Sequence, residues 1–121
     1  RGGDAVALDR ARQRLRRAHR EGERLAMGTG SAALHGPTVQ QELRQWVEAG
    51  IPPALALQAA TGNAAELTGA AHRIGRIETG YEANLLLVDG NPLVDIAAVE
   101  RISLVIFKGE RVRRARLLEP K

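Results

Sequence analysis

The sequence predicts an α/β chain in which a helix-rich first part is followed by a small β part. Two observations carry this prediction. Up to about Ala70, apolar residues recur at the three- and four-residue spacing of amphipathic helices, and alanine is abundant. After Ala70, glycines separate short runs of valine, isoleucine and leucine, which is typical of strands joined by turns. With 121 residues, the chain is long enough for one domain at most.

The first part is predicted to begin with an amphipathic surface helix. From Leu8, apolar residues at helical spacing share one stripe with arginines between them, and Gly22 is placed to end the helix. Residues 25–27 then predict a short buried strand, which runs into the glycine-rich loop of residues 28–31. The expected order is therefore helix, strand and loop.

A second helix is predicted after this loop. Pro37 and Thr38, with Gln41 three residues after the threonine, form a start of the capping-box kind. The helix is expected to end at Gly50. Its core stripe is predicted to consist of Val39, Leu43, Trp46 and Val47.

Two shorter helices are predicted to follow. Pro53 suits the first turn of a helix that runs to about Ala60. Asn63 and Glu66 are then expected to cap a last helix, which stops at Gly69.

The β part contains four strand candidates, with turn signals between them. Lys108-Gly109 is typical of a two-residue hairpin turn. Residues 89–92 (DGNP) predict another turn, after which Asp95 can cap a short helix of residues 96–99. The strand candidates are residues 74–77, 83–88, 102–107 and 110–113.

Basic residues gather at the two ends of the chain. Residues 1–24 hold eight basic and four acidic side chains, residues 108–121 hold six and two, and the middle is net acidic. None of the three aromatic residues lies in either basic end, although aromatic side chains are what stacks on single-stranded nucleic acids. We therefore expect no nucleic-acid partner. An independent basic module that binds nucleic acid with steep salt dependence is the competing interpretation.

Composition excludes several other classes. Without cysteine, the chain has no disulfide, thiolate metal site or cysteine nucleophile. Its longest strongly apolar run, residues 85–88, is far too short to span a bilayer, so we expect a soluble protein, cytoplasmic or exported, with no membrane partner. Because the chain begins at Arg1 and its one methionine is Met27, we interpret it as a fragment of a longer polypeptide.

The individual motifs are weak. Residues 28–33 match the glycine pattern of dinucleotide-binding loops, but the following helix begins several residues too late. His19, His35 and His72 lack partners at metal-ligand spacing, so no complete metal site is expected in this chain. Ser31 lacks the setting of a nucleophilic serine. His35 lies in the loop after the predicted buried strand, where α/β folds often place ligands.

Three ordered motifs together resemble the C-terminal third of metal-dependent amidohydrolases of the imidazolonepropionase-like group. The resemblance extends from about Leu15 to Val112. The motifs are residues 25–38, with LAMGTGS followed by HGPT; residues 42–67, ELRQWVEAGIPPALALQAATGNAAEL; and residues 74–93, IGRIETGYEANLLLVDGNPL.

The resemblance implies a division of the chain. Residues 1–70 would be the end of a (β/α)₈ barrel, namely a helix, the last strand and the following helices. Residues 71–113 would form part of a small β-sandwich built from both ends of the full chain, and residues 114–121 a basic tail. Because neither part is complete, we expect the 121 residues not to form a stable monomer alone.

The resemblance also implies a chemistry and a departure from it. In this family a divalent metal, here expected to be zinc, lowers the pKa of a bound water, and an Asp after the eighth strand takes its proton. The metal ligands would lie upstream of Arg1. Gly30 stands at the position of that Asp, so no catalytic residue is certain in this chain. The candidates for the substrate pocket are Thr29, Ser31 and His35, and His35 is the candidate for a replacement base.

Two functional hypotheses follow from the resemblance. In the first, the parent chain hydrolyses C–N bonds of an amide, a lactam or a similar non-peptide small molecule, and this fragment alone is inactive. In the second, the parent is a catalytically degenerate binding or scaffold protein, as the loss of the Asp at Gly30 suggests. The expected partners are a small-molecule substrate and the remainder of the parent chain, while association into a homo-oligomer is left open. A smaller departure, Asn84 in place of the family's usual Asp, is expected to affect only structure.

Overall fold

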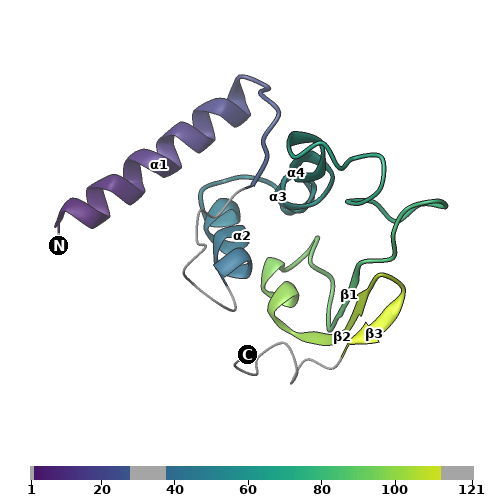
Figure 1. The fold of residues 1–121 in the computed structure, drawn as a ribbon. Helices are drawn as coiled ribbons and strands as arrows, with labels where there is room; N and C mark the ends of the chain where they lie inside the picture. The colour runs from purple at the N-terminus through teal and green to yellow at the C-terminus, as the bar shows by residue number, and fades with distance from the viewer. Residues whose placement is uncertain (1, 28–37, 113–121) are drawn as a thin grey trace.

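The computed structural model describes residues 2–27 and 38–112 (Figure 1). It shows a mixed α/β arrangement in which the four α-helices precede the strands, in the order that the sequence predicts. The helices are α1 (Gly2–Arg20), α2 (Thr38–Glu48), α3 (Pro53–Ala60), α4 (Gly62–Leu67) and the 3₁₀-helix η1 (Ile96–Glu100). The strands are β1 (Leu85–Val88), β2 (Ile102–Phe107) and β3 (Glu110–Val112).

The core lies where α2, α3 and η1 meet. Ile51, in the connector between α2 and α3, is only 1% exposed, and Ala56 and Ala59 are fully buried. Small side chains at these positions let α3 approach its neighbours closely, and the ion pair between Arg44 and Glu100 links α2 to η1 at the surface. The core side chains are Met27, Leu43, Ile51, Ala56, Ala59, Ile96 and Val99.

The predicted helices are confirmed, with two corrections. Val39 was expected in the core stripe of α2 but is 46% exposed, because it lies outside the cluster in which Leu43 is buried. Asn63 was expected to cap α4, but the N-cap residue is Thr61, and Asn63 lies inside the helix. The side-chain contacts of Thr38, and hence the predicted capping box, fall outside the described side chains.

The three strands form one antiparallel sheet in the order β1-β2-β3. Leu85 pairs with Ile106 and Leu87 with Leu104, and the register shifts between Leu87 and Val88. The predicted hairpin turn joins β2 to β3, with φ of 50° at Lys108 and 82° at Gly109, as a type I′ turn requires. The predicted cap of η1 is also confirmed, since the Asp95 carboxylate accepts a hydrogen bond from the Ala97 N–H at 3.1 Å.

Two predicted strands are absent from the described part of the chain. Residues 25–27 do not form a strand, although Met27 is buried as expected. Residues 74–76 form bends, and Ile77 has no regular structure and is 85% exposed. Both segments have the apolar composition of strands, but a strand needs a neighbour to accept its ladder hydrogen bonds, and the described residues provide none at either place.

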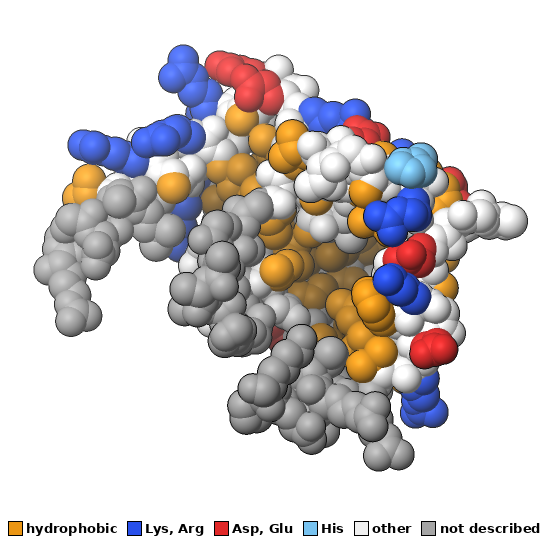
Figure 2. Space-filling model, in the orientation of Figure 1, with side chains coloured by type: hydrophobic (Ala, Val, Ile, Leu, Met, Phe, Trp, Pro, Cys, Tyr) orange, Lys and Arg blue, Asp and Glu red, His pale blue; other side chains and the backbone are white. Residues whose placement is uncertain are grey.

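The sheet exposes apolar side chains on both of its faces. Leu86 and Leu87 are adjacent in β1, so they point to opposite faces, yet they are 55% and 59% exposed. Phe107 at the end of β2 is 54% exposed. Figure 2 likewise shows hydrophobic side chains at the surface over the middle of the visible face, with charged residues around them. A search for membrane-spanning helices among the described residues finds no helix of sufficient length and hydrophobicity.

Candidate functional site

The predicted site residues lie in one segment, residues 28–37, which is outside the described part of the chain. Thr29, Gly30, Ser31 and His35 all belong to it, so their roles stay predictions. Met27, the residue just before the segment, is buried and hydrogen-bonded to α3. Met27 is 9% exposed, and its N–H donates to the Ala59 carbonyl at 2.9 Å. The segment therefore begins at a residue fixed to α3 and ends where α2 begins.

Two polar side chains of α4, Asn63 and Glu66, hold the chain just before this segment through hydrogen bonds and an ion pair. The side-chain amide of Asn63 donates to the Leu25 carbonyl at 2.7 Å, and its oxygen accepts from Arg24 Nε at 3.2 Å. The Arg24 guanidinium also pairs with the Glu66 carboxylate at 2.6 Å. Sequence reasoning took Asn63 and Glu66 for helix caps and missed this role. No local signal could have shown it, because the partners are about 40 residues apart in the sequence.

Glu42 is the first carboxylate that follows segment 28–37 in the chain, and its environment is unusual. Partial burial raises the pKa of Glu42, because it removes water from the charged form, while a hydrogen bond to the Trp46 side chain opposes this rise. Among the described residues, Glu42 has no arginine or lysine partner. Its described contact is with Trp46 on the same helix, so the structure does not tie it to segment 28–37.

The described residues do not fit a metal ion. No group of three or more His, Cys, Asp or Glu side chains among them could hold one. His19 lies near the end of α1, and His72 is exposed in the turns after α4, far apart in the sequence and in different elements. Within the described ranges, the donor set that a divalent metal needs is therefore missing, and the position of the metal ligands stays a prediction.

Asn84, the second departure from the family pattern, holds the turn of the β2–β3 hairpin. Its side-chain oxygen accepts from the Lys108 N–H at 2.8 Å, and its amide nitrogen donates to Glu82 Oε2 at 2.7 Å. Glu82 also receives the Arg73 guanidinium at 3.5 Å. An amide suits this position because it offers one acceptor and one donor, and the donor is what the Glu82 carboxylate requires.

Replacing Asn84 with aspartate is expected to destabilise the full-length protein by about 1 kcal/mol at pH 7. The Asn84→Asp variant loses the hydrogen bond to Glu82 and sets two carboxylates against each other. Their repulsion raises the folded-state pKa values, so the penalty is present above those values and disappears as the pH falls below the unfolded-state values. Urea unfolding between pH 4 and 8 measures this trend.

The double variant Glu82→Gln/Asn84→Asp is the matched control for this prediction. The new glutamine can donate to the new aspartate, so the pair is restored with its donor and acceptor exchanged. We expect the double variant to recover most of the lost stability. Equal stability of Asn84→Asp and the wild type at pH 7 would contradict the hydrogen-bonding role of Asn84.

Comparisons with known proteins relate most of the chain to hydrolases of one family. The profile of the amidohydrolase family matches residues 4–112. The structure resembles a Xaa-Pro dipeptidase with bound methionine in its active site, with a TM-score of 0.76 and 33% identity over 84% of this chain. It also resembles a structure described as a putative prolidase from Bifidobacterium longum, with a TM-score of 0.73 and 36% identity over 85% of this chain. A search of curated proteins finds no match.

A third similar structure is phenylurea hydrolase B, with a TM-score of 0.63 and 38% identity over 66% of this chain. The chain spans only part of each of these proteins. It covers 25% of the Xaa-Pro dipeptidase chain, 28% of the Bifidobacterium longum protein and 17% of phenylurea hydrolase B.

Proposed function

Because the chain belongs to the amidohydrolase family, we propose that it is the C-terminal segment of a longer hydrolase that cleaves C–N bonds in small molecules. The observation that carries this proposal is the match over residues 4–112 together with the similarity to proteins named as hydrolases, a Xaa-Pro dipeptidase and a phenylurea hydrolase. These names include a dipeptidase, so the substrate range to be tested extends from amides, lactams and ureas to Xaa-Pro dipeptides.

The proposed division of the chain is that residues 1–70 complete a (β/α)₈ barrel and residues 71–113 contribute to a β-sandwich. The exposed apolar side chains on both faces of the sheet support it, since a sheet of this composition is stable when both faces are covered. The remainder of the parent chain is the proposed cover. The two segments with strand composition but no neighbours, residues 25–27 and 74–77, would find their partners there.

The proposed cofactor is a divalent metal, with zinc as the first candidate. In such hydrolases the metal activates water and polarises the bond that is cleaved. On the family pattern, its ligands would come from the part of the parent upstream of Arg1, and the described residues offer no metal-binding group of their own. The proposed contribution of this chain is a wall of the substrate pocket, formed by Thr29, Ser31 and His35.

A chelation experiment on the full-length protein tests this function. The purified protein is assayed on a Xaa-Pro dipeptide, an N-acyl amino acid and a phenylurea, before and after dialysis against a chelator. We expect turnover of at least one substrate, a fall of about 100-fold or more on metal removal, and recovery on addition of zinc. Turnover that is unaffected by complete metal removal would contradict the proposal, as would the absence of turnover with every substrate.

A second candidate function is favoured by Gly30. Glycine has no side chain to accept a proton, so in this second proposal the parent binds family substrates as a catalytically degenerate member without cleaving them. In the same assay this candidate predicts saturable binding of a substrate, measured calorimetrically, with no product. Robust turnover by the wild type would rule it out.

A further inference from the structure

Helix α1 has two faces, both rich in arginine but different in their contacts. On the inner face, Arg16 Nε donates to the Ala49 carbonyl at 2.6 Å, and the Arg12 guanidinium lies 3.8 Å from the Glu48 carboxylate. Both acceptors belong to the C-terminal end of α2, where cations are favourable because the helix dipole is negative there. The inner arginines therefore have a structural role, which is to hold α1 against α2.

Within the described ranges, the outer face has no such acceptor from another helix. It consists of Arg10, Arg14, Arg17 and Arg20, which are spaced four, three and three residues apart and are all exposed. These spacings place the four side chains on one side of α1, within about a third of its circumference. Among the described residues, the one ion pair of this face is between Arg17 and Glu21, at 3.3 Å and well exposed.

Like charges at these spacings repel one another and weaken a helix. Within the described structure, the one carboxylate that pairs with these arginines is that of Glu21, and the carboxylate of Asp9 is bonded to a neutral side chain instead. Asp9, which precedes this face by one residue, accepts a hydrogen bond from the Gln13 amide at 3.2 Å. The outer arginine face thus has a surplus of positive charge that an anion would neutralise.

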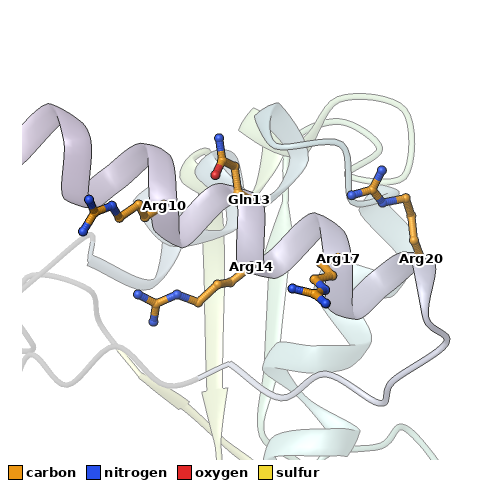
Figure 3. Close-up of a pocket in the computed structure, with 5 residues that line it drawn as sticks. All are labelled: Arg10, Gln13, Arg14, Arg17 and Arg20. Atoms are coloured by element: carbon orange, nitrogen blue, oxygen red, sulfur yellow. The ribbon is translucent and has the colours of Figure 1, made fainter.

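The outer arginines also border an open pocket (Figure 3). Its volume is about 500 Å³, and its described lining consists of Arg10, Gln13, Arg14, Arg17 and Arg20. Every one of these side chains is polar or charged and comes from α1, as Figure 3 shows. Guanidinium groups present several N–H donors in a planar fork, which matches the oxygens of phosphate groups.

We propose that the outer arginine face of α1 binds an oligophosphate anion, either free or as the phosphate tail of a small molecule. The face extends about 15 Å from Arg10 to Arg20, and its successive arginines are about 4.5 to 6 Å apart along the helix axis, so two or three of them can reach one oligophosphate. It contains no aromatic side chain on which a nucleic-acid base could stack. The binding site is independent of the hydrolase function proposed above.

Titration calorimetry of the full-length protein with inorganic triphosphate tests the site. The test variant is Arg10→Gln/Arg14→Gln/Arg17→Gln, which removes three charges and keeps helix propensity, because glutamine is a good helix former. The control is Arg76→Gln/Lys108→Gln/Arg111→Gln, which removes three exposed positive charges that lie outside α1. Circular dichroism verifies that both variants keep the wild-type fold.

We expect the test variant to bind triphosphate at least 10-fold more weakly than the wild type and the control to stay within about 2-fold of it. Absence of triphosphate binding by the wild type at 50 mM salt would overturn the proposal. So would an equal loss in both variants, since it would show a response to net charge alone. In a parallel titration, binding of a short DNA duplex without binding of triphosphate would also overturn it in favour of a nucleic-acid surface.

Discussion

Replacing Gly30 with aspartate in the full-length protein is expected to raise the rate of C–N bond hydrolysis by about 100-fold or more. A positioned proton acceptor contributes on the order of 10² to 10⁴ to the rate of such reactions. Glycine offers no acceptor at the position where the family pattern has Asp. The Gly30→Asp variant supplies one on the same backbone, and kcat measured on the best substrate of the chelation assay reports its effect.

Two further variants show whether the carboxylate acts as a base. Gly30→Asn has nearly the same shape as Gly30→Asp but cannot accept a proton in this way, so we expect it to leave the wild-type rate unchanged. His35→Ala tests whether His35 already serves as the base. If His35→Ala lowers the wild-type rate 100-fold and Gly30→Asp gives no gain, the prediction for Gly30 fails, and His35 holds the base role instead.

Replacing Gly75 with alanine is expected to destabilise the protein by about 3 to 5 kcal/mol. Gly75 has φ of +96°, where a residue with a side chain is strained, and the loop that contains it lies against the start of α4. An added Cβ would lie 2.9 Å from the Ala65 Cβ and 3.1 Å from the Thr61 carbonyl oxygen. Ala65 is buried, and the atom of Thr61 that the new Cβ would contact belongs to the backbone. Neither residue can therefore move aside at low cost.

Gly80→Ala is the matched control for this prediction. Gly80 has nearly the same φ, +91°, but no atom lies within 4 Å of the position of an added Cβ. The control therefore has the backbone strain without the overpacking, and we expect a loss of about 1 to 2 kcal/mol. Urea unfolding of the full-length protein measures both. Equal losses for the two variants would show that close packing at Gly75 contributes nothing.

Elements with local signals were predicted well. The ends of α2 to α4 and the end of α1 lie within a few residues of their predicted positions because proline, glycine and the hydrophobic period act over one or two helical turns. The start of α1 was missed, since the helix begins at Gly2 and the predicted stripe only at Leu8. The Lys108-Gly109 turn and the Asp95 cap were confirmed for the same reason, since each depends on neighbours in the sequence. Segments 25–27 and 74–77 failed because strand formation depends on a partner that local composition cannot provide.

The candidate site was predicted through the family resemblance rather than through local physics. The position of Gly30, and the pocket residues Thr29, Ser31 and His35, follow from the order of three motifs, and the family match over residues 4–112 confirms the resemblance on which they depend. Their roles stay predictions. The supports on either side, such as the bond between Met27 and Ala59, became visible only in three dimensions.

By itself, the sequence determined the family, the order of helices before strands, and the turn chemistry, because these depend on residues close together in the chain. The tertiary structure alone decided how Asn63 holds Leu25, how Arg16 reaches Ala49, and why Gly75 must lack a side chain. It also separated the arginines of α1 into an inner face with acceptors at the end of α2 and an outer face whose one acceptor among the described residues is Glu21. The physical reason is that most of these contacts join residues 10 to 40 positions apart in the sequence. The division of the α1 arginines depends on which side of the helix faces α2, and this is decided only when the helices pack.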